Sequence, residues 1–289
     1  MRHWLVGLPL AAACLFFPSV DAQTQSRDVY VGVVDSRGAP VTDLTAGDFT
    51  VREDGVAREV LKAGPATAPM QIAVLIDDSQ AATDDIHMIR DGLTQFVDAL
   101  HGHEIALITF GERPTLLVDY TTDTAKLKQG IGRVFARSGA GAYFLEAVVE
   151  ASHGFQKREA KRPVMVALMT EGLEFSNLYY QRVLEELEKS RATLHVLTIT
   201  GVKAASTDEV RNRDQVVAEG TDRTGGRRDQ ILAASAIPER MQQLADELLH
   251  QYVVTYARPE TLIPPEKIDV SVKRPGVTVR APRRAAGRS

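Results

Sequence analysis

The sequence predicts an α/β fold, a doubly wound and mostly parallel sheet with helices on both faces. Two observations carry this prediction. Apolar runs of strand length, such as 72–76 and 164–169, alternate along the chain with segments of helical periodicity such as 84–100. Continuous Val, Leu and Ile runs are typical of strands buried on both faces. Their alternation with helices implies parallel strands joined by crossover helices.

The central elements follow one another from residue 72 onwards. A helix is expected at 84–100, with Thr83 as its N-cap and two aspartates in its first turn, where the helix dipole favours negative charge. The segment 206–223 is polar, and its sequence leaves helix and loop both open. The other strands are expected at 105–110, 115–118, 194–199 and 230–232, and the other helices from 122, at 143–155, at 178–190 and from Pro238.

Short β-rich runs at both ends predict a second, smaller unit. We expect the segments 28–62 and 251–281 to pair as an antiparallel β unit beside an α/β domain at 70–248. The ends of a doubly wound domain can lie close together, and unpaired strand edges invite pairing. The runs are 29–34, 49–52, 252–256, 268–272 and 277–280.

Length and composition are those of an ordinary soluble globular protein. The chain has 289 residues, of which 44% are hydrophobic and 25% are charged. This length allows one large domain and a smaller one. The formal net charge of -4 gives no reason to expect a nucleic-acid partner. Basic residues crowd 282–289, which we interpret as a solvated tail.

The first 22 residues predict a secretory signal peptide. A charged start precedes an apolar stretch at 4–17 and a small-residue ending at Ala22. We expect cleavage there and an exported product, periplasmic or secreted, without a transmembrane anchor, because no segment is long enough to span a bilayer. The only cysteine, Cys14, lies in the removed segment, so the mature chain forms no internal disulfide. Lipidation at Cys14 is the less favoured alternative, since apolar residues follow it.

Acidic and hydroxyl side chains follow the first predicted parallel strand. Asp77, Asp78 and Ser79 come directly after the run 72–76. In an open α/β sheet, ligands gather at the carboxyl ends of the strands. This stretch therefore has the composition of half a metal site.

The chain resembles the von Willebrand factor type A domain family, in particular bacterial exported proteins of that family. The resemblance covers about residues 28 to 281 and rests on the order of the strands and on short motifs. Upstream, Leu44-Thr45-Ala46-Gly47-Asp48-Phe49 and then Glu53-Asp54-Gly55 resemble the leader of the bacterial subgroup. The other motifs are Asp-x-Ser at 77–79, Thr170-Glu171-Gly172, Thr224-Gly225-Gly226 and Gln251-Tyr252.

The resemblance implies a metal-ion-dependent adhesion site that is degenerate here. The family binds Mg²⁺, a hard cation that takes oxygen ligands in octahedral geometry. Asp77 and Ser79 match the first two ligands, whereas Ala81 and Ala142 stand where the family has hydroxyls. The distant aspartate falls on Glu171, which is one methylene longer. We expect no cofactor, and Mg²⁺ bound by Asp77, Ser79 and Glu171 is the alternative.

Two further interpretations of these residues remain open. Asp77 and Ser79 can cap the following segment or hydrogen-bond to neighbouring loops. Alternatively, the edge of the sheet works without metal, as an acidic lip that recognises a basic partner surface. Tyr179 begins a helix on the same edge and suits protein recognition, although half-buried packing is an equal alternative. The lip would comprise Asp77, Asp78, Glu171 and Glu174, with Asp119 or Glu146 nearby.

Other candidate sites rank lower. The histidines of 101–104 lie where a helix ends, and His153 and His195 stand alone, so we interpret all of them as structural. Ser79 lacks a nucleophile-elbow glycine pattern and a base placed by the sequence. Thr224-Gly225-Gly226 lacks the Walker lysine spacing and is interpreted as a turn.

The function that these patterns favour is non-catalytic. We expect an exported protein–protein interaction or scaffolding module that uses the loops 77–82, 138–143 and 171–180, with Asp77, Asp78, Ser79, Glu171 and Tyr179 in its binding surface. The partner would be a protein. Metal-dependent adhesion through a residual site and an envelope hydrolase with an unrecognised site are the alternatives.

Overall fold

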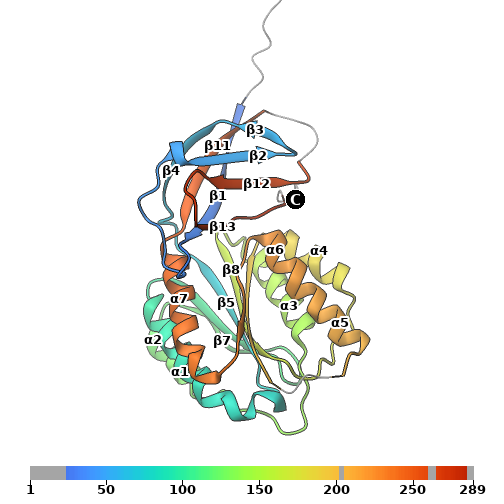
Figure 1. Ribbon diagram of the computed structural model, residues 1–289. Helices are drawn as coiled ribbons and strands as arrows, with labels where there is room; N and C mark the ends of the chain where they lie inside the picture. The colour runs from blue at the N-terminus through green and yellow to red at the C-terminus, as the bar shows by residue number, and fades with distance from the viewer. Residues whose placement is uncertain (1–23, 202–204, 260–264, 285–289) are drawn as a thin grey trace, which may run out of the picture.

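The computed structural model describes residues 24–201, 205–259 and 265–284 (Figure 1). The expected signal peptide, residues 1–22, lies outside these ranges, as does most of the expected basic tail. Within them, no helix is both long and apolar enough to cross a membrane.

A six-stranded sheet forms the centre of the larger unit and confirms the predicted fold class. Its strand order is β10-β9-β8-β5-β6-β7, and only the edge strand β7 runs antiparallel to its neighbour. The strands are β5 (Gln71–Ile76), β6 (Glu104–Thr109), β7 (Thr115–Thr121), β8 (Pro163–Thr170), β9 (Thr193–Ile199) and β10 (Arg228–Ile231).

Helices cover both faces of this sheet and create two cores. Successive residues of a strand point to opposite faces, so Val166 of β8 lies in one core and Met165 in the other. Helices α1 (Ile86–Ala99), α2 (Thr124–Ile131) and α7 (Ile237–Leu249) pack on the first face, and α3 (Phe144–Lys157), α4 (Tyr180–Ser190), α5 (Asp208–Gln215) and α6 (Thr221–Thr224) lie on the second (Figure 1).

The start of α1 differs from the prediction, and Thr83 is not its N-cap. Residues Gln80–Asp85 form a 3-10 helix, and Thr83 donates its hydroxyl to the Gln80 carbonyl at 2.6 Å. Contacts with a distant loop hold this segment, because Gln80 N donates to Ala140 O at 3.0 Å. Local sequence carries no sign of that partner. The segment that the sequence left open, 206–223, is helical: α5 continues through a π-helical turn, Val216–Gly220, into α6.

The chain ends meet in a β-sandwich, as the fold prediction implied, although it consists of two small sheets rather than one. The order of one sheet is β13-β1-β11-β4 and that of the other is β12-β2-β3. Apolar residues of both sheets share one core. The strands are β1 (Thr24–Val34), β2 (Phe49–Glu53), β3 (Val56–Arg58), β4 (Val60–Pro65), β11 (Tyr252–Pro259), β12 (Ile268–Val272) and β13 (Thr278–Arg280).

Two sequence motifs far apart in the chain meet inside the sandwich. The Tyr252 hydroxyl donates to Val41 O at 2.9 Å and accepts from Leu44 N at 3.0 Å. Its ring packs edge-on against Phe49 at 5.3 Å between centroids. The motif at 44–49 and the Gln251-Tyr252 pair are therefore two halves of one packing unit.

Arg162 ties the sandwich to the central sheet. Its guanidinium is buried and donates to the carbonyls of Ala66, Ala68 and Leu248 and to the side chain of Gln251, at 2.8 to 3.2 Å. Ala66 and Ala68 lie in one segment that connects the two units, and Leu248 and Gln251 lie at the other. Arg162 thus bonds to both connecting segments. Buried carbonyls need such donors, because leaving them unpaired costs free energy.

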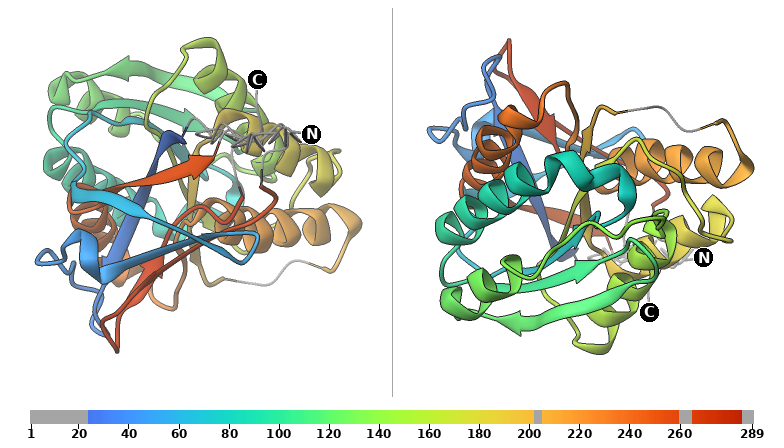
Figure 2. Two further views of the ribbon diagram at one scale, coloured as in Figure 1. Left: turned by 90° about the horizontal axis from the view of Figure 1, so that it is seen from above. Right: turned by 90° about the horizontal axis from the view of Figure 1, so that it is seen from below.

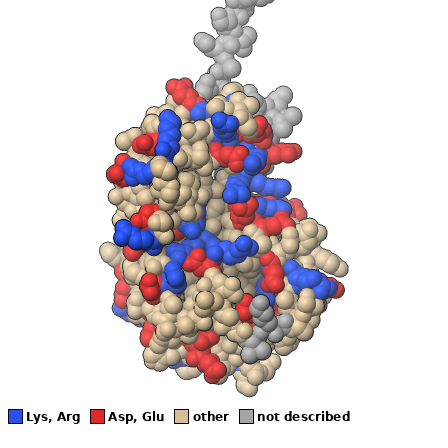
Figure 3. Space-filling view, viewed as in Figure 1, with Lys and Arg blue, Asp and Glu red and all other residues tan. Residues whose placement is uncertain are grey.

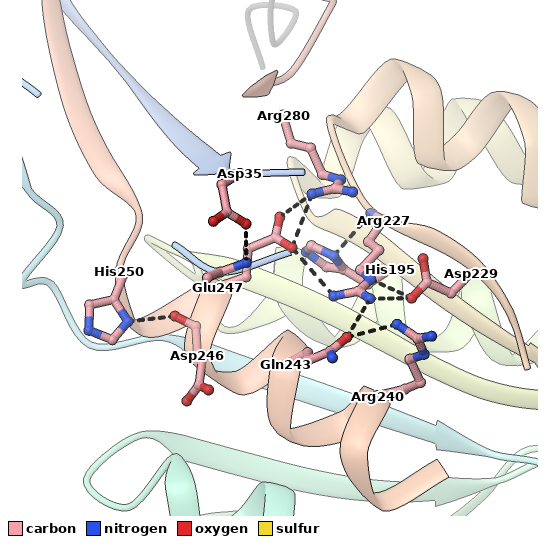
Figure 4. Close-up of polar contacts among 11 residues, drawn as sticks. Asp35, His195, Arg227, Asp229, Arg240, Gln243, Asp246, Glu247, His250 and Arg280 are labelled. Atoms are coloured by element: carbon pink, nitrogen blue, oxygen red, sulfur yellow. Dashed lines mark hydrogen bonds and ion pairs between the residues drawn. The ribbon is translucent and has the colours of Figure 1, made fainter. Parts of the chain in front are cut away.

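A network of buried charged side chains forms a second contact between the sandwich and the larger unit (Figure 4). Glu247 of α7 accepts two hydrogen bonds from Arg280 of β13, at 3.0 and 3.1 Å. Arg227 lies 3.8 Å from the same carboxylate, pairs with Asp229, and donates its backbone N–H to His195 Nδ1 at 3.1 Å. Charged side chains of both signs gather where the two units meet (Figure 3). Burial of this kind is tolerated because each charge has a partner.

The Thr224-Gly225-Gly226 motif lies at this junction. Gly225 ends α6 with φ at 72°, and a Cβ there would overlap the backbone of Ala281. A Cβ on Gly226 would overlap the Leu194 carbonyl. The two glycines therefore allow three backbone segments to approach closely.

Gly226→Ala is expected to lower the free energy of unfolding by about 2 kcal/mol or more, because the added methyl group forces backbone apart. Gly154→Ala is the matched control, since a Cβ at this position in α3 meets nothing within 4 Å. It should stabilise the protein by about 0.5 to 1 kcal/mol. Urea unfolding measures both, and equal effects would contradict the proposed close approach.

His195 should make the protein sensitive to acid. Burial lowers its pKa from 6.5 to about 3, so below pH 6.5 the unfolded chain binds a proton that the folded protein does not. Stability should then fall by about 1.4 kcal/mol per pH unit as pH drops from 6.5 towards 3. In His195→Asn, which keeps an acceptor for Arg227 N, this part of the slope should disappear. Parallel stability curves for the two proteins between pH 7.5 and 5 would refute the assignment.

Candidate functional site

Three loops meet at the carboxyl end of the central sheet, at the end far from the sandwich (Figures 1 and 2). We call the loops 77–82, 138–143 and 171–180 the rim. The right-hand view of Figure 2 looks onto this end of the sheet. Backbone bonds join the loops: Gln80 N donates to Ala140 O at 3.0 Å, and Phe175 N donates to Ala142 O at 2.7 Å. The predicted proximity of the three loops is present in the structure.

Asp77 is buried at the centre of the rim, and protein donors occupy both of its carboxylate oxygens. Oδ1 accepts from Ser79 N at 2.9 Å. Oδ2 accepts from Thr170 N at 2.9 Å and from the Thr170 hydroxyl at 2.6 Å. Asp77 therefore connects the end of β5 to the end of β8. The sequence analysis did not predict Thr170 as a partner of Asp77. Thr170 does belong to the Thr170-Glu171-Gly172 motif that carried the family resemblance.

Asp78 is buried as well and pairs with Arg137. Its Oδ1 accepts from Gly111 N at 2.5 Å, and its Oδ2 lies 2.9 Å from Arg137 Nε. The hydrogen bond that Arg137 donates to Asp78 raises the pKa of Arg137, which also donates to Glu112 at 3.1 Å. The sequence did not single out Arg137. The sequence feature that could have identified Arg137 is its position, a basic residue directly before the 138–142 loop.

Glu171 points away from Asp77, towards the β9–β10 side of the rim. Its carboxylate accepts from Gln230 Nε2 at 3.0 Å and from Gly201 N at 3.4 Å. It lines a cleft of about 590 Å³ together with Arg213 and Arg228. The sequence placed Glu171 at the carboxyl end of the sheet, but only the structure shows which way its carboxylate turns.

The residues on the rim do not fit a six-oxygen Mg²⁺ site. Both oxygens of Asp77 are engaged, Glu171 is directed elsewhere, and Ala81 and Ala142 offer no side-chain oxygen. Across residues 24–201, 205–259 and 265–284, no group of three or more His, Cys, Asp or Glu side chains is arranged to hold a metal ion. One observation points the other way: the buried Ser79 hydroxyl has no hydrogen-bond partner among the residues that the structure describes.

Glu174 is buried under the rim and holds the 171–180 loop on α3. Its Oε1 accepts from Phe144 N at 3.0 Å and from Ser176 N at 3.3 Å, and Leu145 N donates to Ser176 Oγ at 3.1 Å. These bonds satisfy the first N–H groups of α3, whose own N-cap residue, Tyr143, provides no side-chain bond. Burial raises the pKa of Glu174 to about 8, and within the described ranges its Oε2 has no hydrogen-bond partner. This pKa favours the protonated carboxyl at neutral pH.

The hypothesis of an exposed acidic lip is wrong, because Asp77, Asp78 and Glu174 are at most 3% exposed. Each of them bonds to backbone or to a cation, which is what burial of a carboxylate requires. Glu146 accepts from Asn177 N at 3.1 Å. Asp119 pairs with Arg158 at 2.6 Å.

What the rim exposes is apolar and aromatic. Tyr179 is 77% exposed, Leu173 49% and Phe175 45%. The Phe175 ring packs over Gly141 and lies edge-on to Tyr143 at 6.2 Å between centroids. Tyr179 was predicted from the sequence. Leu173 and Phe175 were not predicted. The sequence feature that could have identified them is the presence of two apolar residues in a loop beside the predicted site.

The other histidine candidates have structural partners. His103 Nδ1 accepts from Met70 N at 3.2 Å, and burial lowers the pKa of that histidine. His153 contacts Glu186 at 3.1 Å on the surface.

Comparisons with known proteins agree with the fold of the larger unit. Residues 72–173 match the family model described as the von Willebrand factor type A domain. No curated protein matches the chain. A solved structure described as von Willebrand factor type A from Catenulispora acidiphila is 15% identical, with a TM-score of 0.52, covering 92% of this chain and 74% of its own. Proximal thread matrix protein 1 from the mussel byssus is 14% identical, with a TM-score of 0.52, covering 68% of this chain and 50% of its own. At such identities these likenesses concern the fold.

Glu174 should make the stability of the protein fall as pH rises from 4.5 to 8. Its pKa is higher in the folded protein, about 8, than in the unfolded chain, 4.5, so the folded protein binds more protons between these values. Its contribution to stability is complete below pH 4.5 and should be lost by about 1.4 kcal/mol per pH unit as pH rises towards 8. Glu174→Gln removes the titration. The free energy of unfolding of the variant minus that of the wild type should therefore rise with pH across this range. A constant difference in urea unfolding from pH 5 to 8 would contradict this.

Proposed function

Because residues 72–173 match the model of the von Willebrand factor type A domain, we propose that this chain is a non-catalytic protein-binding module whose contact surface is the rim. Domains of this type mediate protein interactions. The observation that carries the proposal is the exposure of Leu173, Phe175 and Tyr179 on a single rim loop. Exposed apolar groups that lie together mark interaction sites more often than apolar groups scattered singly.

The loop that carries these side chains is held in place before any partner binds. Glu174 and Ser176 bond it to the start of α3, and Leu173 O accepts from Ala142 N at 2.8 Å. A surface ordered in advance pays less conformational entropy on binding. Tyrosine adds large contact area with few rotatable bonds and retains a hydroxyl for a partner. Of the predicted binding residues, Tyr179 is the one that we place in direct contact, whereas Asp77 and Asp78 position the loops from below.

The compartment in which the module works is part of the proposal. We place it outside the cytoplasm, in the periplasm or secreted, on the strength of the signal sequence at 1–22. A partner would then be another exported or envelope protein.

We propose no catalysis because of the surroundings of Ser79, the hydroxyl at this edge that the sequence analysis weighed as a nucleophile. Its hydroxyl is buried and no base among the described residues hydrogen-bonds to it. An activated serine needs such a base within hydrogen-bond reach. Hydrolysis of peptide, ester or phosphoester substrates should therefore be absent and unaffected by Ser79→Ala. A rate that falls on this substitution would favour the alternative of an envelope hydrolase.

Metal-dependent adhesion is a second candidate because no described residue hydrogen-bonds to the Ser79 hydroxyl. We favour metal independence, since the other ligand positions lack free oxygens. Calorimetric titration with Mg²⁺, Mn²⁺ and Ca²⁺ should give no saturable heat. Saturable binding that Asp77→Ala abolishes would establish the second candidate instead.

The test of the rim is affinity capture from the native envelope fraction with the wild type and with Leu173→Ser plus Tyr179→Ser. The rim variant should lose its specific partners, because the changes remove apolar contact area without opening a cavity. Leu61→Ser is the matched control: this leucine is 51% exposed but lies on β4 of the sandwich.

Unchanged capture by the rim variant would move the binding surface away from the rim. Equal losses in the rim variant and in Leu61→Ser would show that general surface hydrophobicity, rather than this loop, retained the partners.

A further inference from the structure

A second candidate surface lies around Phe135, which is 61% exposed. This residue belongs to the segment between α2 and the rim loop 138–143. Val134, directly before it, is 1% exposed and packs in the core on the first face of the sheet. Because Val134 anchors the segment in the core, the ring beside it stays at the surface. One exposed ring is ordinary in a soluble protein, so the groups around it decide whether it has a role.

Arg90 of α1 holds the Phe135 ring. The Arg90 Cζ atom lies over the ring at 4.4 Å from its centroid. Its Nε donates to the Val134 carbonyl at 2.8 Å, and its Nη2 donates to the same oxygen. A guanidinium over a ring face is attracted by the negative potential of that face. The ring and the cation are therefore presented together, where α1 meets the segment that follows α2 (Figure 1).

The charge of Arg90 remains available for a partner. A carbonyl oxygen accepts hydrogen bonds but carries no net charge, and the Nη1 group of Arg90 lies outside the bonds to Val134. Arg133, two residues before Phe135, is exposed and bonds in the same way: its Nη2 donates to Leu117 O at 3.0 Å. In the described part of the chain, neither arginine forms an ion pair with a carboxylate. Two positive charges are thus placed beside one exposed ring.

Arg137, two residues after Phe135, differs from these two arginines. It pairs with Asp78 at 2.9 Å and with Glu112 at 3.1 Å, so its charge is balanced inside the protein. Arg137 therefore supports the rim, whereas the cations that can meet a partner are the two described above.

We propose that Arg90, Arg133 and Phe135 form a docking surface for a protein segment that carries a carboxylate beside a large apolar side chain. The carboxylate accepts hydrogen bonds from the guanidinium groups, whose planar fork matches its two oxygens. The apolar side chain packs on the Phe135 ring. Because this packing excludes water, which screens charges, the ion pair gains strength beside the ring. Arginine and aromatic side chains are also enriched at protein interfaces.

The surrounding charges favour such a segment over a long polyanion. A polyanion gains affinity by contacting many cations at once. Here the formal net charge is -4, Asp91 follows Arg90 in the sequence, and Glu112 lies beside Arg137. A polyanion that extended beyond Arg90 and Arg133 would therefore meet like charges, whereas a single carboxylate needs only these two cations. The exposed ring adds an apolar contact that a protein side chain can fill.

This surface goes beyond the proposed function of the rim and does not depend on it. Phe135 and the two arginines lie outside the loops 77–82, 138–143 and 171–180 that form the rim. Variants of the rim and variants of this surface can therefore be compared directly, and the failure of one proposal can be told from the failure of the other.

The probe is a fluorescein-labelled heptapeptide with one tryptophan between two glutamates and with glycine and serine at its ends. It is titrated with the purified protein and followed by fluorescence anisotropy. We expect saturable binding that weakens as salt is raised, because exposed charges are screened. A peptide with lysine in place of both glutamates should not bind. A peptide with glycine in place of tryptophan should bind at least about tenfold more weakly, because it cannot pack on the ring.

Two variants test the surface from the protein side. Phe135→Ser should weaken binding by at least about tenfold. Arg133→Gln should weaken it by about threefold, since one exposed ion pair contributes little. Both side chains are exposed, so neither change opens a cavity in the core. The matched controls are Leu61→Ser and Arg37→Gln, which change exposed residues of the sandwich and should bind the peptide like the wild type.

Several results with the peptides would overturn the proposal. One is the lack of saturable binding by the wild type at up to about 1 mM protein. Equal binding of the peptide without tryptophan, together with displacement by inorganic phosphate, would show a small-anion site. Tighter binding of heparin that is lost in Arg133→Gln would identify a polyanion as the occupant.

The protein variants can contradict the proposal as well. Equal weakening by Arg37→Gln and Arg133→Gln would show non-specific charge attraction. Weakening by Leu173→Ser plus Tyr179→Ser equal to that by Phe135→Ser would place the peptide on the rim. Self-association of the protein that Phe135→Ser abolishes would identify a second copy as the occupant.

Discussion

The pairing of Glu247 with Arg280 and Arg227 is the constraint on which the arrangement of the two units depends. A carboxylate this deeply buried is costly unless cations reach it, and its two cations come from opposite sides of the junction. Arg280 belongs to the sandwich and Arg227 to the central sheet, so the network exists only when the two units are docked. The close approach of the chain at Gly225 and Gly226 follows from the same requirement, because Arg280 and Ala281 must pass directly over the end of α6.

The junction also separates the surroundings of the two ends of the parallel strands. Arg162 bonds to both connections between the units, which fixes the sandwich over the starts of the parallel strands. The carboxyl ends of the strands are left free for the rim on the opposite side. One end therefore presents apolar and aromatic side chains, whereas the charged side chains that line a cavity at the other end are mostly basic.

On the rim, protein donors bond to each of the buried carboxyl groups. Asp77 accepts hydrogen bonds from Thr170 and Ser79, and Asp78 forms an ion pair with Arg137. Burial raises the pKa of Glu174, which favours its protonated form. Three carboxyl groups are thereby accommodated below the surface, and they order the loops that carry Leu173, Phe175 and Tyr179. The acidic residues act as supports for the surface rather than as the surface itself.

The sequence by itself determined the class of fold, the succession of strands and helices along the chain and the meeting of its two end segments, because hydrophobic periodicity and turn signals reveal individual strands and helices. It also located Asp77, Ser79 and Glu171 at one edge of the sheet. It could not determine the capping at Thr83, the burial of Asp77, Asp78 and Glu174, or the direction of the Glu171 carboxylate. These depend on partners distant in the chain, such as Ala140, Arg137, Phe144 and Gln230. Only the tertiary structure decided whether each carboxyl group faces water or a protein donor, because the free energy of a charge depends on its surroundings rather than on its neighbours in sequence.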